Sequence, residues 1–355
     1  MPARRRPRLP AALLLALVLA IVAAACGGGD DDGETGGTGT EDTPAGDPVT
    51  LSIVGFAVPE AANKAIAAAW AKTPEGENVR FKTSYGASGD QSRAVVAGLE
   101  ADYVHLSVAS DVTRLVDAGL VDAAWDKGTN KGVVSSSIVV FAVRSGNPKN
   151  IKTWDDLVEP GVGIVTPNPG SSGAARWNAL AAWGQVIEAG GSEAEATAYL
   201  DAFFENVVAL PGSGRDATTA FLAGTGDVLM AYENEAILAR QSGEKFEYIV
   251  PATTLLIENP GAILKTAKPK AQEWLEFVLS EEGQKEFALK GFRPIIEGVK
   301  YGKVDGANDP SKPFPTVKNL LTVSKDFVSW SDLSKRFFDP NTGIVTKAIA
   351  ASGKR

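Results

Sequence analysis

The stretch TLSIVGFAVPEAANKAIAAAWAK, residues 50–72, decides the fold class. Residues 50–56 are mostly apolar, which predicts a buried strand. Pro59 then opens an Ala-rich segment that ends at Lys72, and proline is favoured in the first turn of a helix. The stretch therefore predicts a strand followed directly by a helix.

The same alternation continues along the chain. Further strands are expected at residues 79–85, 103–108, 137–143, 163–166, 207–210, 228–231, 247–250 and 254–257. Further helices are expected at residues 88–101, 110–118, 172–187, 193–206, 216–223, 233–240 and, as the longest amphipathic helix, 269–289. Strands that alternate with helices of this length indicate βαβ units, hence an α/β fold with a mostly parallel sheet flanked by helices.

The body of the chain, from residue 48 onward, is longer than one core usually holds, so we expect two domains. The apolar extended runs 137–143 and 246–257 suit crossings between them. We expect a first lobe of residues 48–136 plus 252–355 and a second lobe of residues 137–251. Ligands of open α/β sheets bind at the carboxyl ends of strands, so two facing lobes make a cleft.

The N-terminus has the pattern of an export signal. Arginines within residues 4–8 precede an apolar run at 11–25, which is short for a membrane span but suits a signal peptide. The run VAAAC, ending at Cys26, resembles a lipobox. We predict a lipoprotein signal peptide in residues 1–25, with Cys26 as lipid anchor; an ordinary cleaved signal with an incidental cysteine is the alternative.

Residues 26–47 contain seven acidic residues, no basic ones and almost no apolar ones. Such a segment buries too little surface to offset its ordering entropy, so we predict a disordered tether. Residues 48–355 keep 31 basic and 36 acidic residues and are only mildly acidic.

The composition of the 355 residues excludes several kinds of site. One histidine, His105, cannot supply a His-rich zinc site, and one cysteine permits no internal disulfide. An acidic chain is also a poor nucleic-acid binder, because that binding needs clustered Lys and Arg. Pairs of carboxylates remain possible, and Glu233 and Glu235 are one such pair, although we favour a non-catalytic role. His105 lies in an apolar strand, so we expect a structural residue.

Three loops share one pattern, in which small residues lie between a strand and a helix start. A helix N-terminus offers unpaired amides and a partial positive charge, which suits an anion. The alternative for each loop is a serine that merely caps its helix. The loops are SYGASGDQ (84–91), TPNPGSSGAARW (166–177) and GSGRDAT (212–218).

The motifs in and around these loops resemble the bacterial sulfate- and thiosulfate-binding proteins of ABC importers, a branch of the type II periplasmic binding-protein fold. The likeness covers residues 50–294 and extends more loosely to the C-terminus. The matching stretches are SYGASGDQ (84–91), GLEADYVHLSVASDV (98–112), VRSGNPKNIKTWDDLVEPGVGIVTPNPGSSGAARWNALAAWG (143–184), GTGDVLMAYENEAIL (224–238) and SEEGQKEFALKGFRP (280–294).

The resemblance implies an oxyanion held between two lobes by uncharged donors. It assigns amides to Ser88, Gly173, Ala174 and Gly214 and a hydroxyl to Ser172. It also implies that two arginines brace the loops from behind without touching the ion; these are Arg176 and Arg215.

Two positions depart from the family pattern. Tyr232 stands where the family usually has a tryptophan donor, and a phenol can accept a hydrogen bond as well as donate one. Ala57 stands at an acidic position of the family, where its backbone amide can still donate.

The resemblance implies a binding protein and not an enzyme, with sulfate as ligand, an ABC permease as partner, and no cofactor or metal. We expect a monomer, exported and lipid-anchored to the outer face of the cytoplasmic membrane. A donor-only site suits sulfate, which has no proton to give at neutral pH. Thiosulfate, molybdate or tungstate are alternative ligands, and an anion-sensing signalling lipoprotein is the alternative of a different class.

Overall fold

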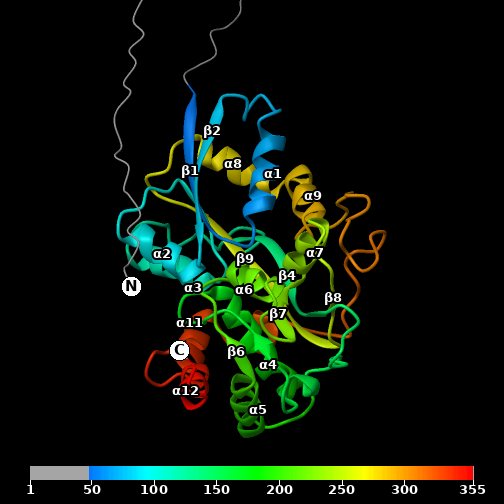
Figure 1. Ribbon diagram of the computed structural model, residues 1–355. Coiled ribbons are helices and arrows are strands. Elements are labelled where there is room, and N and C mark those ends of the chain that lie inside the picture. Colours follow the sequence, from blue (N-terminus) through cyan, green and yellow to red (C-terminus); the bar gives the residue numbers. More distant parts are fainter. Residues whose placement is uncertain (1–47, 355) are drawn as a thin grey trace, which may run out of the picture. The chain divides into compact units, whose positions relative to one another are not determined.

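The computed structural model describes residues 48–354 (Figure 1). The predicted signal peptide (1–25), Cys26 and the predicted tether (26–47) lie outside the described residues, and they stay predictions. No helix of the described part is long and apolar enough to cross a membrane.

The opening stretch folds as its sequence predicts. β1 is buried from Leu51 onward and pairs in parallel with both β2 and β3. The predicted βαβ arrangement is therefore present in this part of the chain. Its elements are β1 (Val49–Phe56), α1 (Glu60–Trp70), β2 (Val79–Gly86), α2 (Ser88–Val96), β3 (Tyr103–His105) and α3 (Ala109–Asp117).

Two long strands, β4 (Val133–Arg144) and β9 (Thr253–Ile263), lie side by side in the middle of the sheet. They pair with each other in antiparallel fashion. β9 also pairs with β3, and β4 pairs with β7 (Val228–Tyr232), both antiparallel. Both strands occur where the sequence predicts chain crossings. The sheet order is β2-β1-β3-β9-β4-β7-β5-β6.

The segment between these two strands forms the other end of the sheet. β5 pairs in parallel with β6 and β7, whereas β8 pairs antiparallel with β4. The sheet is therefore mixed: β1–β3 and β5–β7 pair in parallel, as predicted, whereas β4 and β9 run antiparallel to each other and to β3, β7 and β8. The remaining elements of this segment are η1 (Asp155–Val158), β5 (Ile164–Val165), α4 (Gly173–Glu188), α5 (Glu193–Glu205), β6 (Val207–Ala209), α6 (Gly214–Leu222), α7 (Glu233–Gln241) and β8 (Phe246–Ile249).

The single long helix predicted for residues 269–289 is wrong. The segment forms two helices, α8 (Lys270–Leu279) and α9 (Glu281–Leu289). Ser280 separates them in an extended conformation, with φ −72° and ψ 165°, and its hydroxyl accepts a bond from the Gly283 amide. Ser280 thus ends α8 and caps the N-terminus of α9.

The C-terminal helices pack on α4 and α5, whereas the strand before them pairs in parallel with β9. Trp330 meets Trp177 edge to face at 4.7 Å, and Phe337 meets Trp183 in the same way at 5.0 Å. The C-terminal helices therefore contact α3 as well as α4 and α5. The elements are β10 (Asn319–Leu321), α10 (Val323–Asp326), α11 (Trp330–Phe338) and α12 (Ile344–Ala351).

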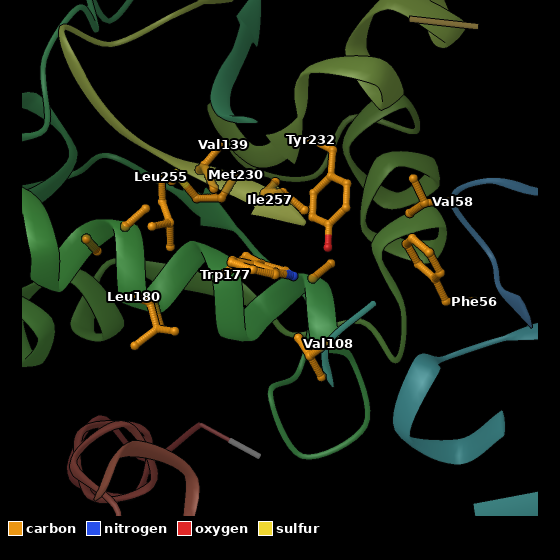
Figure 2. Packing of buried hydrophobic residues seen from close by; sticks show 14 of the residues in the cluster. Phe56, Val58, Val108, Val139, Trp177, Leu180, Met230, Tyr232, Leu255 and Ile257 are labelled. Atoms are coloured by element: carbon orange, nitrogen blue, oxygen red, sulfur yellow. The ribbon is translucent and has the colours of Figure 1, made fainter. Parts of the chain in front are cut away.

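A buried cluster holds α4 against the sheet (Figure 2). Trp177 and Leu180 of this helix share that cluster with Val139, Met230 and Leu255 of three strands. Burying each large apolar side chain contributes about 1.5–3 kcal/mol. The packing fixes where the N-terminus of α4 lies.

Candidate oxyanion site

The predicted loops come together in the fold. The Gly89 amide of α2 donates to the Ser171 carbonyl at 2.9 Å. A Cβ added at Gly173 would lie 2.5 Å from the Cβ of Ser107, and one added at Gly214 would lie 3.3 Å from that of Ala174. The starts of α2, α4 and α6 therefore meet around the loop that precedes α3.

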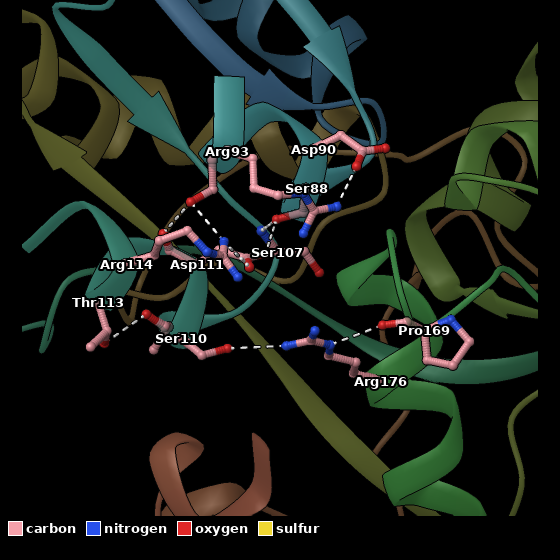
Figure 3. Close-up of polar contacts among 12 residues, drawn as sticks. Ser88, Asp90, Arg93, Ser107, Ser110, Asp111, Thr113, Arg114, Pro169 and Arg176 are labelled. Atoms are coloured by element: carbon pink, nitrogen blue, oxygen red, sulfur yellow. Dashed lines mark hydrogen bonds and ion pairs between the residues drawn. The ribbon is translucent and has the colours of Figure 1, made fainter. Parts of the chain in front are cut away.

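The hydroxyl of Ser88 is engaged within this group. It accepts a bond from the Ser107 amide at 2.9 Å and donates to Asp111 Oδ2 at 2.6 Å (Figure 3). Asp111 is also paired with Arg114 at 3.0 Å. The Ser88 amide lies in the first turn of α2, where it has no acceptor within the helix. The amide is the group that Ser88 can offer to a ligand.

Ser172 differs from the other hydroxyl residues that start helices. Six described helices have Ser or Thr at the N-cap, and five of those side chains accept a bond from their own helix. The Ser172 hydroxyl makes no such bond, although the residue is only 3% exposed. The capping alternative therefore does not hold for Ser172. Its hydroxyl stays available beside the first-turn amides of Gly173 and Ala174.

In the third loop, unlike at Ser172, the serine hydroxyl caps its own helix. Ser213 caps α6 by accepting a bond from the Asp216 amide at 3.1 Å. Gly214 follows it in the first turn, so its amide has no acceptor in the helix. A Cβ at Gly214 would also lie 3.1 Å from Val58. The loop after β1 thus lies against the start of α6.

Ala57 does not have the free amide that the sequence led us to expect. That amide donates to the Gly86 carbonyl at 2.9 Å, which continues the pairing of β1 with β2. Ala57 is therefore not a free donor.

Tyr232 ends β7 and starts α7, and its side chain is 1% exposed. Its hydroxyl is directed toward Trp177 and α4 (Figure 2) and lies 2.8 Å from the Ser107 hydroxyl. Burial raises the pKa of Tyr232, so the phenol keeps its proton at neutral pH. Our sequence reasoning missed Ser107. The signal was available, because HLSVASD has the same strand, small-residue loop and helix start.

The two predicted bracing arginines bind loop groups. Arg176 donates to the Pro169 carbonyl at 3.2 Å and to the Ser110 hydroxyl at 3.4 Å (Figure 3). Arg215 pairs with both oxygens of Glu235, at 2.7 and 3.0 Å, and donates to the Val58 carbonyl at 3.3 Å. Each guanidinium therefore ties together loops from different parts of the chain.

Comparison with known proteins identifies the family. Residues 51–293 match the family described as bacterial extracellular solute-binding protein. The chain belongs to this family. A sulfate-binding protein of Synechococcus elongatus is 41% identical over 308 residues, which cover 83% of this chain and 85% of that protein. A thiosulfate-binding protein of Pseudomonas aeruginosa is 36% identical, with 75% of this chain and 81% of that protein covered.

Solved structures agree with the fold of this solute-binding protein. The sulfate-binding protein SubI from Mycobacterium tuberculosis has a TM-score of 0.77 and 40% identity, covering 82% of this chain and all of that one. The periplasmic binding protein AfuA from Actinobacillus pleuropneumoniae has a TM-score of 0.60 at 20% identity, with 86% and 98% covered. The predicted periplasmic binding-protein fold is confirmed.

The paired carboxylates of this solute-binding protein are held in separate ion pairs. Glu233 bonds Arg293 at 2.7 Å, whereas Glu235 bonds Arg215. Burial raises the pKa of both carboxyl groups, and the arginines oppose that rise. Both residues are nearly inaccessible to solvent. The arrangement suits fixing α7 better than acid–base work. Among residues 48–354 no cluster of His, Cys, Asp and Glu could hold a metal ion.

His105 is fully buried, as a structural residue would be. Its Nδ1 lies 3.2 Å from Asn63 Oδ1 and its Nε2 lies 3.1 Å from the Ser135 hydroxyl. Burial lowers the pKa of His105 from 6.5 to about 3. The ring is therefore neutral in the folded protein at pH 7.

We predict that His105 makes folding stability fall as the pH drops below about 6.5. Between pH 6.5 and about 3 the unfolded chain binds a proton at this histidine and the folded chain does not, so the free energy of unfolding decreases as the pH falls through this range. Above pH 6.5 the imidazole is neutral in both states, and the contribution to stability is complete. The slope approaches about 1.4 kcal/mol per pH unit. Urea unfolding of the wild type and His105→Gln between pH 4 and 8 measures it. Parallel curves for the two proteins would contradict the prediction.

Proposed function

We propose that this protein captures sulfate where its helix N-termini meet and delivers the ion to an ABC importer, without performing chemistry on it. The observation that carries the proposal is the Ser172 hydroxyl, which is buried beside first-turn amides and does not cap its own helix. Relatives named sulfate-binding proteins, at 35–41% identity, support the choice of ion.

The proposed donors are all uncharged. They are the amides of Ser88, Gly173, Ala174 and Gly214 and the hydroxyls of Ser172 and Tyr232. Nearby carboxylates are already occupied, because Asp111 bonds Ser88 and Arg114 while Glu235 bonds Arg215. A protonated oxyanion needs an acceptor, and a proton left unpaired in a buried site costs about 1–3 kcal/mol. The set therefore favours an anion without a proton.

We place the two lobes as the sequence predicts them, at residues 48–136 plus 252–355 and at residues 137–251. The antiparallel pair β4–β9 carries the chain between them and supplies the hinge. The start of α2 then belongs to the first lobe, and the starts of α4 and α6 belong to the second lobe. Separation of the lobes would release the ion, and their approach would enclose it.

Thiosulfate is the second candidate ligand, favoured by the relative from Pseudomonas aeruginosa that carries that name. It is also a tetrahedral dianion without a proton at neutral pH. The two candidates differ in the size of one terminal atom, which the donor set does not decide by itself.

Isothermal titration of the purified, dialysed protein with each oxyanion tests the function. We expect sulfate to bind at micromolar or lower concentration, more tightly than molybdate, because several relatives carry the name sulfate-binding protein. We expect phosphate to bind less tightly than sulfate, because its proton would need an acceptor. Tighter thiosulfate binding would move the assignment to the second candidate. Binding of molybdate without sulfate would overturn the proposal.

Two serine variants separate binding from stability. Ser172→Ala should weaken sulfate binding by about 1–3 kcal/mol with little change in stability, because its hydroxyl caps nothing. Ser192→Ala is the matched control, since Ser192 forms a full capping box with Glu195 at the exposed start of α5. It should lower stability by about 1 kcal/mol and leave affinity unchanged. Titration and urea unfolding measure the two effects, and equal affinity losses would contradict the assignment.

We also propose that the protein works as an exported monomer anchored by lipid at Cys26 on the outer face of the cytoplasmic membrane. The support is the lipobox-like run in the sequence. Cys26→Ser should move the protein from the membrane fraction to the soluble fraction, as immunoblotting of fractionated cells would show. Retention of the variant in the membrane fraction would refute the anchor.

A further inference from the structure

Ser107 lies where the two proposed lobes meet, and it forms hydrogen bonds with both of them. The residue follows β3, and the sheet order places β3 and β7 on opposite sides of the β9–β4 pair. The Ser107 amide donates to the Ser88 hydroxyl at 2.9 Å, within the first lobe. The other two polar groups of Ser107, its carbonyl and its hydroxyl, are bonded by side chains of the second lobe.

The Ser107 carbonyl is bonded from the second lobe by Trp177. The indole Nε1 of Trp177 donates to this carbonyl at 2.9 Å, and Asn259 Nδ2 of the first lobe donates to it at 3.0 Å. An indole has a single N–H, so Trp177 has no further hydrogen for a ligand. A carbonyl oxygen only accepts, so it offers nothing to an anion. The bond between Trp177 and Ser107 therefore joins the lobes without the ion.

The Ser107 hydroxyl is bonded from the second lobe by Tyr232. The two hydroxyl oxygens lie 2.8 Å apart. Figure 2 shows the indole nitrogen of Trp177 and the phenol oxygen of Tyr232 directed toward the same place. We call Ser107, Trp177 and Tyr232 together the Ser107 clasp. Each of the three residues is at most 1% exposed, so the bonds of the clasp are shielded from water.

Two arginine bonds join neighbouring helix starts across the same lobes, but they are longer. Arg176 reaches the Ser110 hydroxyl at 3.4 Å, and Arg215 reaches the Val58 carbonyl at 3.3 Å. Both arginines are partly exposed, so water competes for their donors. The clasp bonds are shorter and lie in a buried place, where a lost partner is costly. Separation of the lobes therefore has to break the clasp.

We propose that Ser107 is a positioning residue whose clasp by Trp177 and Tyr232 holds the lobes closed and sets how long the ion stays bound. The inference rests on the proposed function, because it concerns the retention of the proposed ligand. A bond that exists only in the closed form raises the affinity for every ligand by the same factor, since the apparent affinity scales with the population of that form. The clasp therefore controls release and leaves selectivity unchanged.

Trp177→Phe tests the carbonyl end of the clasp, because phenylalanine keeps an aromatic ring and removes the N–H. We expect sulfate to dissociate roughly fivefold faster, with an association rate close to that of the wild type, in stopped-flow fluorescence. The ratio of the Kd values for sulfate and selenate, two tetrahedral dianions, should stay the same. An unchanged dissociation rate would overturn the proposal, and so would a changed ratio.

Trp274→Phe is the matched control. Trp274 is also fully buried, but its Nε1 has no hydrogen-bond partner within residues 48–354. Its replacement removes the same atoms from a core without breaking a bond between the lobes. We expect the wild-type dissociation rate for sulfate, together with a lower stability in urea unfolding. Equal acceleration in the two variants would trace the effect to loosened packing and contradict the proposal.

The hydroxyl end of the clasp is tested by a double-mutant cycle. Ser107→Ala should also speed the dissociation of sulfate, because the bond to Tyr232 is lost. In a Tyr232→Phe background the Ser107 hydroxyl has lost that partner, so adding Ser107→Ala should not change the dissociation rate again. A further increase in the double variant would show that the Ser107 hydroxyl bonds the ion itself, and Ser107 would then not be a positioning residue.

Failure of this inference can be told apart from failure of the proposed function. If the wild type binds sulfate and Trp177→Phe releases it at the wild-type rate, only the inference fails. If the wild type binds no sulfate, the proposed function fails, and small-angle X-ray scattering decides about the clasp. Trp177→Phe should then have a larger radius of gyration than the wild type, and equal radii would overturn the inference.

Discussion

The first amides of a helix have no acceptor within it, and this constraint organises the centre of the molecule. Some helices meet this constraint locally, since α5, α9, α10 and α11 are each capped by a serine or threonine. At the centre the starts of α2 and α4 receive no side-chain cap. The molecule thus gathers unpaired donors in one place, and the sheet order makes that possible because the strands before these loops lie on both sides of the β4–β9 pair.

The charged side chains near these donors bond other groups of the protein, so they do not take the place of the uncharged donors. Arg215 and Arg293 neutralise the buried glutamates at the start of α7, and Arg114 pairs with the aspartate that receives the Ser88 hydroxyl. Arg176 bonds a carbonyl and a hydroxyl. Because these charges have partners within the protein, hydrogen-bond geometry decides what the site prefers. A net negative body is therefore compatible with an anion ligand.

Local sequence predicted the order of strands and helices and picked out the loops at helix starts, because hydrophobic period and helix-start residues act over short distances. That these loops surround one ion was implied by the family resemblance. Local sequence could not separate Ser172 from Ser213, since both precede a helix after small residues and only the fold decides which hydroxyl caps. The Ala57 amide is occupied by Gly86, a partner set by strand pairing. The break at Ser280 was missed because a serine inside an amphipathic pattern is also tolerated within a helix. The direction of β4 and β9 depends on pairing between segments more than a hundred residues apart.

The aromatic contacts of α11 bear on how fast a bound ligand could be released. Trp330 of this helix packs on Trp177 in α4, while α11 also touches α3. If the starts of α3 and α4 move apart to release an ion, α11 cannot keep both contacts unchanged. Release of the ligand would then require this C-terminal helix to lose contacts with one of its two neighbours, which would lengthen the residence time of the ligand.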